Sequence, residues 1–588
     1  MEEDHDCDID RQAQCGKRDS KNSGSTYQRG RIHERERYMV TWTFGNMLSL
    51  AMPKDYGMDR PERGDFPINP APFRLMVKHI RTDTGWIPDI NAVLQLKVIE
   101  KVFAACESII AATDAPGRGK WCSGTFTGIW NAGNPTAVYG SRHLRTKPCW
   151  REWATSGPAA CMTACFWQRT AATRRTVLGL NASYALCQAT GTGNNSLGRV
   201  QTPVLAAISS RYRERENHIA TDTFPVLISL CKSNTLLKMR CTEEFTDREA
   251  AAQLTVTANW PDMHVSPLSA GSQGDRASSL YNLTELQKDA NNYYGMAAGK
   301  SLEIAQRLYE KKLISYPRTA GRFLPRDVYD KLPRIMEKIL NRKEFRPYVR
   351  SMGINIFDLP DKVVDEGQTA EHHAIIITDT YPEGLNREEM QLYMMIIGRM
   401  LEAFMPACRA EYTTVDAVCA ARNFRCHACR IIEKGWFGIF ERESVIAGRE
   451  YGFSPIPQLE NGETAAVTGC SLIHRKDLPV SAYTDAELIT YMDTAGLGTA
   501  ATRTGILQTL IDRKYVRYSG KYIIPTRKGL YIYETVRNMK IAGTALTSGW
   551  EAQLTRMERG KLTQEEFMKG VLKLSGEVTE DIFRKCER

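Results

Sequence analysis

The sequence predicts a multidomain protein of the α+β class. Its 588 residues correspond to roughly four domains of ordinary size. A composition that is 42% hydrophobic and 25% charged is that of a globular chain with sizeable cores. Two regions with strand-like alternation bracket a mostly helical block, so a β element is entered, left and entered again.

The N-terminal part predicts an α/β unit over residues 38–113. The runs "YMVTWTF" and "SIIAAT" are strand-like, and "INAVLQLKVIEKVFAACE" between them has helical spacing. Residues 116–176 then show no sustained period and an unusual content of Trp, Cys and Gly.

Regular patterns return at Leu178. The stretch "SLGRVQTPVLAAISSRYRERE" from Ser196 predicts a helix opened by a basic loop. Strand-like alternation over 223–257 and 411–440 brackets the helical block of 283–404. The last hundred residues are predicted to be helical with one hairpin, "KYVRYSGKYIIPT", turning at Ser519-Gly520, which is a winged-helix pattern.

Charge and composition narrow the choice of partner and compartment. A formal net charge of +10 favours a polyanion such as nucleic acid, although a mildly basic protein without nucleic acid stays open at this point. No apolar run is long enough to span a membrane, and the N-terminus lacks the pattern of a secretory signal, so a cytoplasmic protein is expected. The scattered cysteines predict free thiols. The pair Cys426 and Cys429 has no second pair at zinc-binding spacing.

One tyrosine stands in a chemically suggestive setting. In "KKLISYPRTAGRFLP", Tyr316 is followed by Pro317, which stiffens the chain, and by Arg318. A phenol can attack a phosphodiester whose charge is neutralised, and a guanidinium neutralises phosphate with a planar donor fork. A purely structural tyrosine in a Pro-containing turn is the alternative that this motif leaves open by itself.

Several segments in order resemble the type IA DNA topoisomerases, most closely their topoisomerase III branch. They are "SLGRVQTPVL" from Ser196, "SLYNLTELQKDANNYYGMAAGKSLEIAQRLYEKKLISYPRT" from Ser279, "TAEHHAIIIT" from Thr369 and "LGTAATRTGILQTLIDRKYVRYSGKYIIPTRKGLYI" from Leu497. The resemblance covers roughly residues 38–115 and 177–585.

The resemblance implies a toroid that opens and closes around DNA. Its parts would be a Toprim-like α/β domain, a β arch and helical domains with winged-helix character. The implied ranges are an aberrant N-terminus at 1–37, a Toprim-like domain at 38–176 with 116–176 aberrant, a helical DNA-binding domain at 177–220 and 480–588, a β-arch gate domain at 221–280 and 405–479, and a helical domain with the catalytic tyrosine at 281–404.

The resemblance also implies an activity and three catalytic residues. Tyr316 would cleave single-stranded DNA, hold the 5′-phosphate as a phosphotyrosine ester and return it to the 3′-hydroxyl after another strand has passed. Arg318 would stabilise the transferring phosphate, and His372 would position it. Because the ester conserves the energy of the broken bond, no ATP is needed, and no P-loop motif is present.

The same likeness implies DNA-contacting residues and a setting. The implied DNA contacts are Ser196, Leu197, Gly198, Arg199, Val200, Gln201, Arg503 and Asn46. The implied partner is DNA, mainly single-stranded, bound by a cytoplasmic monomer that works with a helicase and without a membrane.

The family's acidic motif is not intact. A Mg²⁺ ion is implied by the resemblance, and Asp114 in "ATDAPGRGKW" would be one of its ligands. The family's following acids are replaced, and Arg118 and Lys120 stand nearby, so the metal site is damaged in this sequence. A catalytically impaired remnant that still binds single-stranded DNA is therefore the alternative function.

Frameshifts would explain these departures. Codons compatible with "PGRGKWCSGTFT", "CMTACFWQ" and "IDRQAQCGK", read in another frame, can encode family-like segments at the expected places. The hypothesis is that residues of about 2–37 and 116–176 are out-of-frame translation, and the nucleotide sequence tests it.

Overall fold

The computed structural model divides into two compact units. The first comprises residues 1–207, 492–517 and 525–588, and the second comprises residues 208–491 and 518–524. The structure describes residues 6–10, 27–29, 32–35, 38–43, 47–51, 53–58, 61–69, 74–82, 85–106, 108–114, 136–141, 176–191, 195–232, 235–255, 263–265, 269–275, 279–341, 343, 359–365, 367, 372–419, 421–439, 452–453, 462–558 and 561–587. The domain boundaries expected from the sequence are finer than these two units and stay predictions.

The first unit contains a six-stranded sheet in the order β10-β9-β1-β4-β3-β2. Its strands are β1 (Asp6–Asp10), β2 (Tyr27–Arg29), β3 (Ile32–Arg35), β4 (Tyr38–Trp42), β9 (Ser108–Asp114) and β10 (Thr136–Ser141). β1 pairs in parallel with both β4 and β9, and β9 pairs in parallel with β10. Parallel strands need crossover connections, and helix α2 (Ile90–Ala104) lies between β4 and β9 in the chain. The strands and the helix predicted within 38–113 are therefore confirmed.

Helix α2 is fixed to the sheet by a buried amide. The Gln95 side chain is fully buried and donates to the carbonyl of Trp42 (2.7 Å) and to the hydroxyl of Thr41 (3.1 Å). Asp89 caps the helix by accepting from the N–H groups of Asn91 and Ala92. The short elements beside it are β5 (Leu48–Leu50), η1 (Pro53–Tyr56), η2 (Arg63–Asp65), β6 (Leu75–Val77), β7 (His79–Thr82) and β8 (Gly85–Pro88).

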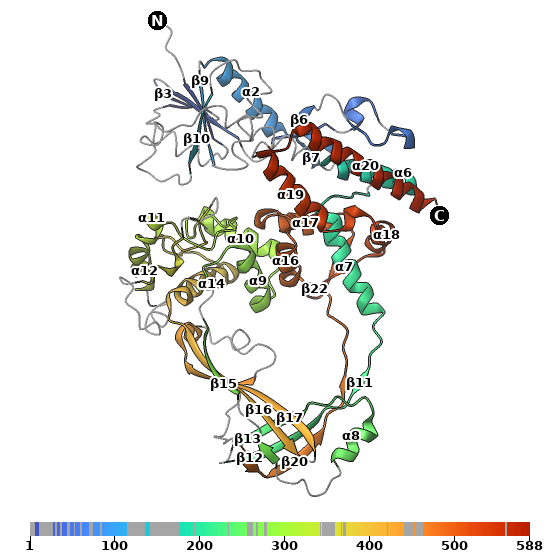
Figure 1. Ribbon diagram of the computed structural model, residues 1–588. Helices are drawn as coiled ribbons and strands as arrows, with labels where there is room; N and C mark the ends of the chain where they lie inside the picture. The colour runs from blue at the N-terminus through green and yellow to red at the C-terminus, as the bar shows by residue number, and fades with distance from the viewer. Residues whose placement is uncertain are drawn as a thin grey trace. The chain divides into compact units, whose positions relative to one another are not determined.

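Helices from both ends of the chain complete the first unit. They are α6 (Thr176–Thr190), α17 (Ala500–Asp512), α18 (Arg527–Val536), η6 (Lys540–Ala542), α19 (Ala545–Glu558) and α20 (Gln564–Cys586). α6 and α20 pack side by side (Figure 1). On α6, the buried Asn181 accepts from the N–H of Ile68 (2.6 Å) and donates to its carbonyl (3.0 Å), so the loop at Ile68 is held to the helix.

The predicted hairpin near the C-terminus is present with its turn shifted by one residue. β23 (Val516–Ser519) and β24 (Tyr522–Pro525) are joined by Gly520 and Lys521, so Ser519 belongs to the strand and the turn predicted at Ser519-Gly520 was misplaced. Gly520 has a φ of 59°, the left-handed conformation that two-residue hairpin turns require at their first position. β22 (Tyr483–Thr484) pairs with β24, and α16 (Asp485–Thr494) follows β22.

The second unit contains the helical block. Its helices are the later part of α7 (Gln201–Glu216), then α9 (Leu283–Tyr294), α10 (Ala298–Glu310), α11 (Arg326–Tyr329), α12 (Leu332–Leu340), η4 (Asp361–Val363) and α14 (Arg387–Phe404). α14 is buried along most of its length and lies in the main hydrophobic core. α9 ends at Gly295, whose φ of 62° terminates the helix in the left-handed conformation.

The second unit also contains a nine-stranded sheet. Its strands are β12 (Val226–Lys232), β13 (Thr235–Cys241), β14 (Met263–Val265), β15 (Ser269–Asp275), β16 (Cys408–Cys419), β17 (Arg422–Glu433), β18 (Gly452–Phe453), β19 (Thr464–Ala465) and β20 (Val467–Leu472). β11 (Asp222–Thr223) pairs separately with β21 (Arg475–Lys476), and η5 (Gly435–Ile439) follows β17. Buried and more exposed side chains largely alternate along β16, as expected for a strand with one face on a core.

One segment of the predicted β region is helical. Residues 248–255, "REAAAQLT", form α8 (Arg248–Thr255) although strand-like alternation was predicted over 223–257. Alanine and long unbranched side chains favour a helix, and the Asp247 carboxylate accepts from the N–H of Glu249 (2.9 Å) where the helix begins. Local residues therefore favour a helix that starts at Arg248, and the strand predicted from the alternation of residues 248–255 was wrong.

Most described cysteines are free thiols, as predicted. They are Cys187, Cys231, Cys241, Cys408, Cys419, Cys426, Cys429, Cys470 and Cys586. Cys106 is disulfide-bonded, which corrects the expectation of free thiols at that position. Within the described parts of the chain, no helix combines the length and the apolar character that crossing a membrane requires.

Glu389 joins α14 to the end of α10. Its carboxylate accepts from Arg307 (3.0 Å) and Lys311 (2.9 Å) and from the backbone N–H of Asn386 (3.2 Å), and only 4% of the side chain is exposed. The hydrogen bonds from Lys311 and Arg307 lower the pKa of Glu389 from 4.5 to about 2. Lys311 begins the chain segment that leads to Tyr316.

We expect Glu389→Gln to destabilise this junction by about 2 kcal/mol at neutral pH, because two cations lose their charged partner. The folded-state pKa lies below the ordinary value, so the stabilisation is complete above about pH 4.5 and is lost as the pH falls toward 2. Hydrogen exchange of α10 and α14 peptides at several pH values measures it. Glu388→Gln, which removes the exposed neighbour paired with Lys300, should change exchange little. An equal effect of both variants would contradict the prediction.

Candidate functional site

Tyr316 lies in a non-helical segment of the second unit, between α10 and α11. A β-bridge joins Ile314 to Ile377, and the N–H of Ser315 donates to the carbonyl of Ile376 (2.8 Å). A second bridge joins Tyr281 to Ile375. The segment that carries Tyr316 therefore lies alongside residues 372–377, which belong to the predicted "HHAIIIT" stretch.

Ser315 strengthens this pairing with its side chain. Its hydroxyl donates to the carbonyl of Ala374 (3.0 Å) and accepts from the N–H of Ile376 (3.0 Å). Residues 374–377 are almost completely buried and belong to the main core of this unit. The residue directly before the tyrosine is thus fixed to a rigid part of the fold.

Thr319 fixes the chain on the other side of the tyrosine. Its side-chain hydroxyl donates to the carbonyl of His372 (2.7 Å) and accepts from the N–H of Gly321 (2.9 Å), and the residue is 2% exposed. A Cβ atom on Gly321 would lie 2.4 Å from the same carbonyl, so only glycine fits. The glycine at position 321 is therefore required by the packing of this loop.

These contacts bring two predicted residues, Tyr316 and His372, together. The Tyr316 ring centroid lies 4.5 Å from that of His372, and the ring of Tyr309 contacts Tyr316 edge-on at 5.4 Å. Tyr316 and His372 are partly buried, whereas Arg318 is exposed. Among the described residues Arg318 forms no ion pair, so its guanidinium is available to an anion.

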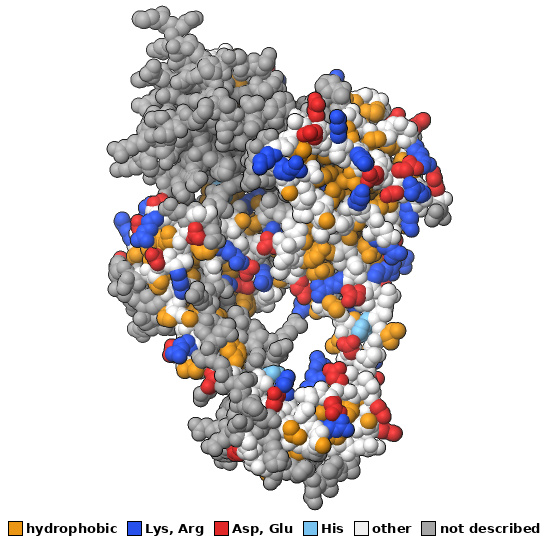
Figure 2. Space-filling view, in the orientation of Figure 1, with side chains coloured by type: hydrophobic (Ala, Val, Ile, Leu, Met, Phe, Trp, Pro, Cys, Tyr) orange, Lys and Arg blue, Asp and Glu red, His pale blue; other side chains and the backbone are white. Residues whose placement is uncertain are grey.

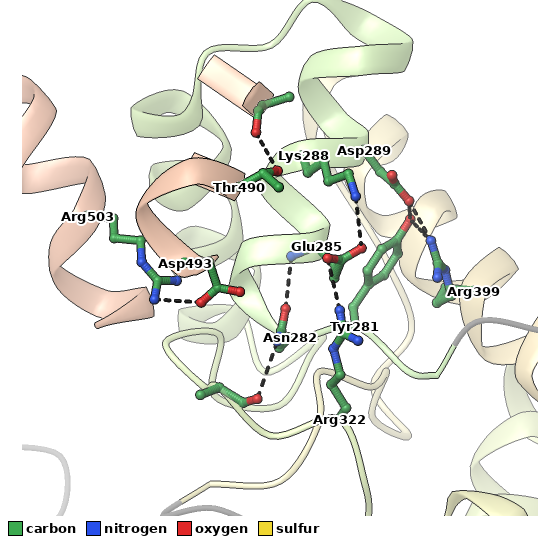
Figure 3. A network of polar contacts seen from close by, with 12 residues as sticks. Tyr281, Asn282, Glu285, Lys288, Asp289, Arg322, Arg399, Thr490, Asp493 and Arg503 are labelled. Carbon is green, nitrogen blue, oxygen red and sulfur yellow. Dashed lines mark hydrogen bonds and ion pairs between the residues drawn. The ribbon is translucent and has the colours of Figure 1, made fainter. Parts of the chain in front are cut away.

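α9 supports the chain that follows the tyrosine (Figure 3). The Asn282 side chain caps α9 by accepting from the N–H of Glu285 (2.9 Å) and also donates to the carbonyl of Ala320 (3.3 Å). Arg322 forms an ion pair with Glu285 (2.9 Å). The loop after Arg318 is thus held to α9 through the carbonyl of Ala320 and the side chain of Arg322.

A buried polar group of Tyr281, Asp289 and Arg399 lies beside Glu285 (Figure 3). The Tyr281 hydroxyl donates to the Asp289 carboxylate (2.6 Å), which also accepts from Arg399 (2.5 Å). The Arg399 guanidinium stacks over the Tyr281 ring at 4.4 Å. Because Tyr281 forms a β-bridge with Ile375, this group fixes the segment that follows His372.

The segment predicted to contact single-stranded DNA belongs to the first unit. Tyr515 holds its start, because the Tyr515 hydroxyl accepts from the N–H of Ser196 (2.6 Å) and donates to its carbonyl (3.1 Å). Gln201 donates to the Ser196 hydroxyl (3.1 Å) at the start of α7. Leu197 is buried, and the carbonyl of Arg199 accepts from Thr547 (2.9 Å).

Residues 196–201 differ in how far their side chains are exposed to solvent. Leu197 points into the unit, whereas Ser196, Gly198, Arg199, Val200 and Gln201 are partly exposed. The hydrogen bond from Thr547 fixes the backbone of Arg199, whose side chain is the basic group among residues 196–201. A DNA-contact role for these residues stays a prediction.

Arg503, one of the predicted DNA contacts, is a buried cation in the structure. It lies near the start of α17 and is 6% exposed, with its guanidinium 2.6 Å from the Asp493 carboxylate and 3.2 Å from the carbonyl of Gly498. Burial lowers its pKa, although Asp493 acts in the opposite direction. The contacts are those of a loop-fixing residue, and a DNA contact by Arg503 stays a prediction.

The remaining predicted residues cannot be built into a site. Asn46 lies outside the described residues, and of Asp114 only the backbone at the end of β9 is described. The described residues contain no group of three or more His, Cys, Asp or Glu side chains arranged to hold a metal. Arg118 and Lys120, which follow Asp114 in the sequence, lie outside the described residues, and a Mg²⁺ site at Asp114 stays a prediction.

Three residues beside the candidate nucleophile were not predicted from the sequence: Ser315, Thr319 and Tyr309. Ser315 and Thr319 carry hydroxyl groups on either side of Tyr316, and this pattern could have indicated that they fix the segment. Tyr309 lies seven residues before Tyr316, on α10, and helix geometry alone does not bring it to the loop.

Comparisons with known proteins agree with this geometry. A family model described as DNA topoisomerase matches residues 170–569, which is more than half of the chain and includes Tyr316, Arg318 and His372. The chain therefore belongs to the DNA topoisomerase family, which confirms the resemblance stated above.

Individual relatives narrow the branch. The chain is 27% identical to DNA topoisomerase 3 of Bacillus licheniformis, over 91% of this chain and 76% of that protein. It is also 27% identical to DNA topoisomerase 3 of Bacillus subtilis, over 93% and 78%. The structure resembles full-length topoisomerase I from Thermotoga maritima, with a TM-score of 0.67, 17% identity and coverage of 99% and 91%. Nothing in these comparisons supports the impaired remnant.

Proposed function

We propose that the protein is a type IA, topoisomerase III-like enzyme that cleaves and rejoins single-stranded DNA through Tyr316. The observation that carries the proposal is the contact between the Tyr316 phenol and the His372 imidazole in a chain of the DNA topoisomerase family. Arg318, two residues after Tyr316, is exposed and forms no ion pair among the described residues. A toroid that admits a second strand, a monomeric state, a cytoplasmic location and a helicase partner belong to the same proposal.

The proposed chemistry is a reversible transesterification. The Tyr316 oxygen attacks phosphorus, the bond to the 3′-oxygen breaks, and the phenol loses a proton while the leaving oxygen gains one. Arg318 donates to the phosphate oxygens as charge builds up, and His372 holds the phosphate beside the ring. Rejoining reverses each step. None of these steps is assigned to the Mg²⁺ that the family implies.

Covalent trapping tests the proposal. Protein mixed with a single-stranded oligonucleotide labelled at its 3′ end and quenched with denaturant should carry the labelled fragment from the 3′ side of the break. Mass spectrometry should find it joined through its 5′-phosphate to the peptide that contains Tyr316. Relaxation of negatively supercoiled plasmid, with Mg²⁺ and with chelator in parallel, measures whether the full cycle runs and whether it needs the metal. Binding without any adduct would favour the impaired remnant instead.

Thr319 gives a further prediction. Thr319→Val keeps the shape of the side chain but leaves the carbonyl of His372 and the N–H of Gly321 without their partner. Losing two buried hydrogen bonds costs about 1–3 kcal/mol and loosens the two segments that carry Tyr316 and His372. We expect adduct formation to fall by about tenfold, with oligonucleotide binding retained. Thr319→Ser should restore the adduct, and a serine variant as poor as valine would refute the hydrogen-bond explanation.

A further inference from the structure

Four basic residues of the first unit gather where the hairpin begins and α18 starts. Arg513, Lys514, Arg527 and Lys528 are here called the wing-base cluster. The Lys528 ammonium donates to the carbonyl of Arg513 (3.5 Å), and the hydroxyl of Thr526 donates to the carbonyl of Lys514 (2.6 Å). The strand-side and helix-side cations are therefore neighbours in space. Figure 2 shows Lys and Arg side chains grouped on the surface where α18 lies in Figure 1.

Three of these four cations form no ion pair within the described parts of the chain. They are Arg513, Lys514 and Arg527, and all three are exposed. The first turn of α18 carries no acid, although basic residues at that end of a helix are unfavourable. The neighbouring acid, Asp512, accepts from Gln508 (2.8 Å).

The pKa of Lys528 responds to this crowding. Burial lowers it most, and the positive charges of Arg513 and Lys514 lower it further. Like charges held together without an acid cost free energy in the isolated protein, and a polyanion removes that cost.

Tyr515 connects the cluster to the predicted single-strand segment. The Lys528 ammonium lies over the Tyr515 ring, 5.1 Å from its centroid, and the hydroxyl of the same ring holds both backbone groups of Ser196. α18 packs directly on this tyrosine, since a Cβ on Gly529 would lie 2.0 Å from the Tyr515 carbonyl. One buried side chain thus lies between the cluster and residues 196–201, within one unit.

We propose that the wing-base cluster binds backbone phosphates of the single DNA strand that contacts residues 196–201, as a second phosphate-binding surface away from Tyr316 in the sequence. That the bound polyanion is DNA rests on the proposed function. The site itself rests on the exposed Arg513, Lys514 and Arg527, which form no ion pair among the described residues, and on their closeness to Lys528. Cations that track the backbone add affinity without reading bases, and each phosphate they neutralise adds about 0.7 to the salt dependence of binding to single strands.

Salt-dependent binding tests the proposal. Fluorescence anisotropy of a labelled single-stranded oligonucleotide is measured over a range of salt with full-length Tyr316→Phe protein, so cleavage plays no part. Adding Arg513→Ala and Lys514→Ala should reduce the slope of log K against log salt by about 1.4 and weaken binding by about tenfold or more at low salt. Lys528→Gln should act in the same direction, and Lys528→Arg should not.

The matched control removes two exposed lysines of α20 in the same unit, by Lys569→Ala and Lys573→Ala. It lowers the net charge equally and should leave the slope unchanged. An unchanged slope in the cluster variant, a change equal to that of the control, or a change seen only with blunt duplex would overturn the proposal.

Circular dichroism checks whether the variants fold. If the Arg513→Ala, Lys514→Ala protein is unfolded, the comparison of Lys528→Gln with Lys528→Arg decides the proposal. Adduct formation by protein with Tyr316 intact is scored separately, so failure of the proposed cleavage is distinguishable from failure of this surface.

Discussion

Tyr316→Phe protein is expected to form no covalent adduct with single-stranded DNA and to relax no plasmid, while it binds the oligonucleotide about as well as the unaltered protein. The substitution removes one oxygen and keeps the ring. The edge contact with Tyr309 and the contact with His372 depend on the ring, so the segment should keep its place. Loss of a nucleophile without loss of binding is the signature of a covalent mechanism.

Tyr309→Phe is the matched control, because it removes a hydroxyl from the neighbouring ring in the same cluster. It should retain adduct formation. An adduct in the Tyr316→Phe protein, or its disappearance in Tyr309→Phe alone, would show that the nucleophile was wrongly assigned. Absence of an adduct in the unaltered protein, with binding intact, would instead support the impaired remnant.

The local parts of the site follow from the sequence. Tyr316 and Arg318 are two residues apart and flank a proline, so their proximity needs no tertiary information. The pairing of His372 with Tyr316 came from the family resemblance, because 56 positions of chain separate them and a β-bridge between Ile314 and Ile377 closes that distance. Strand alternation predicted β16 and β17 correctly because each has one face on a core.

Other features depend on tertiary packing that no short pattern encodes. Thr319 acts through a backbone carbonyl, and any residue at position 372 would supply that group. The burial of Arg503 could not be predicted, because it depends on the Asp493 carboxylate and the carbonyl of Gly498, which contact its guanidinium in the folded chain. α8 carried an alternating pattern, yet its helix-forming residues and its cap decided the outcome.

Arg318→Ala is expected to slow single-turnover cleavage by about 10²–10³-fold while weakening oligonucleotide binding only a few-fold. The guanidinium is exposed and forms no ion pair among the described residues, so its loss leaves no buried carboxylate unpaired and should not unfold the loop. Its contribution is expected to grow as charge accumulates on the transferring phosphate. Arg318→Lys should recover part of the rate, because an ammonium supplies the charge but not the planar fork.

Arg322→Ala separates this role from a general effect of positive charge near the site. Arg322 lies four residues further along and is paired with Glu285 at 2.9 Å, so its removal should loosen the loop without a comparable loss of cleavage. Rapid-quench measurement of adduct formation gives the rate, and anisotropy gives the affinity for the same oligonucleotide. If cleavage and binding fell by the same factor in Arg318→Ala, the guanidinium would be a ground-state DNA contact, and the transition-state role proposed for it would be wrong.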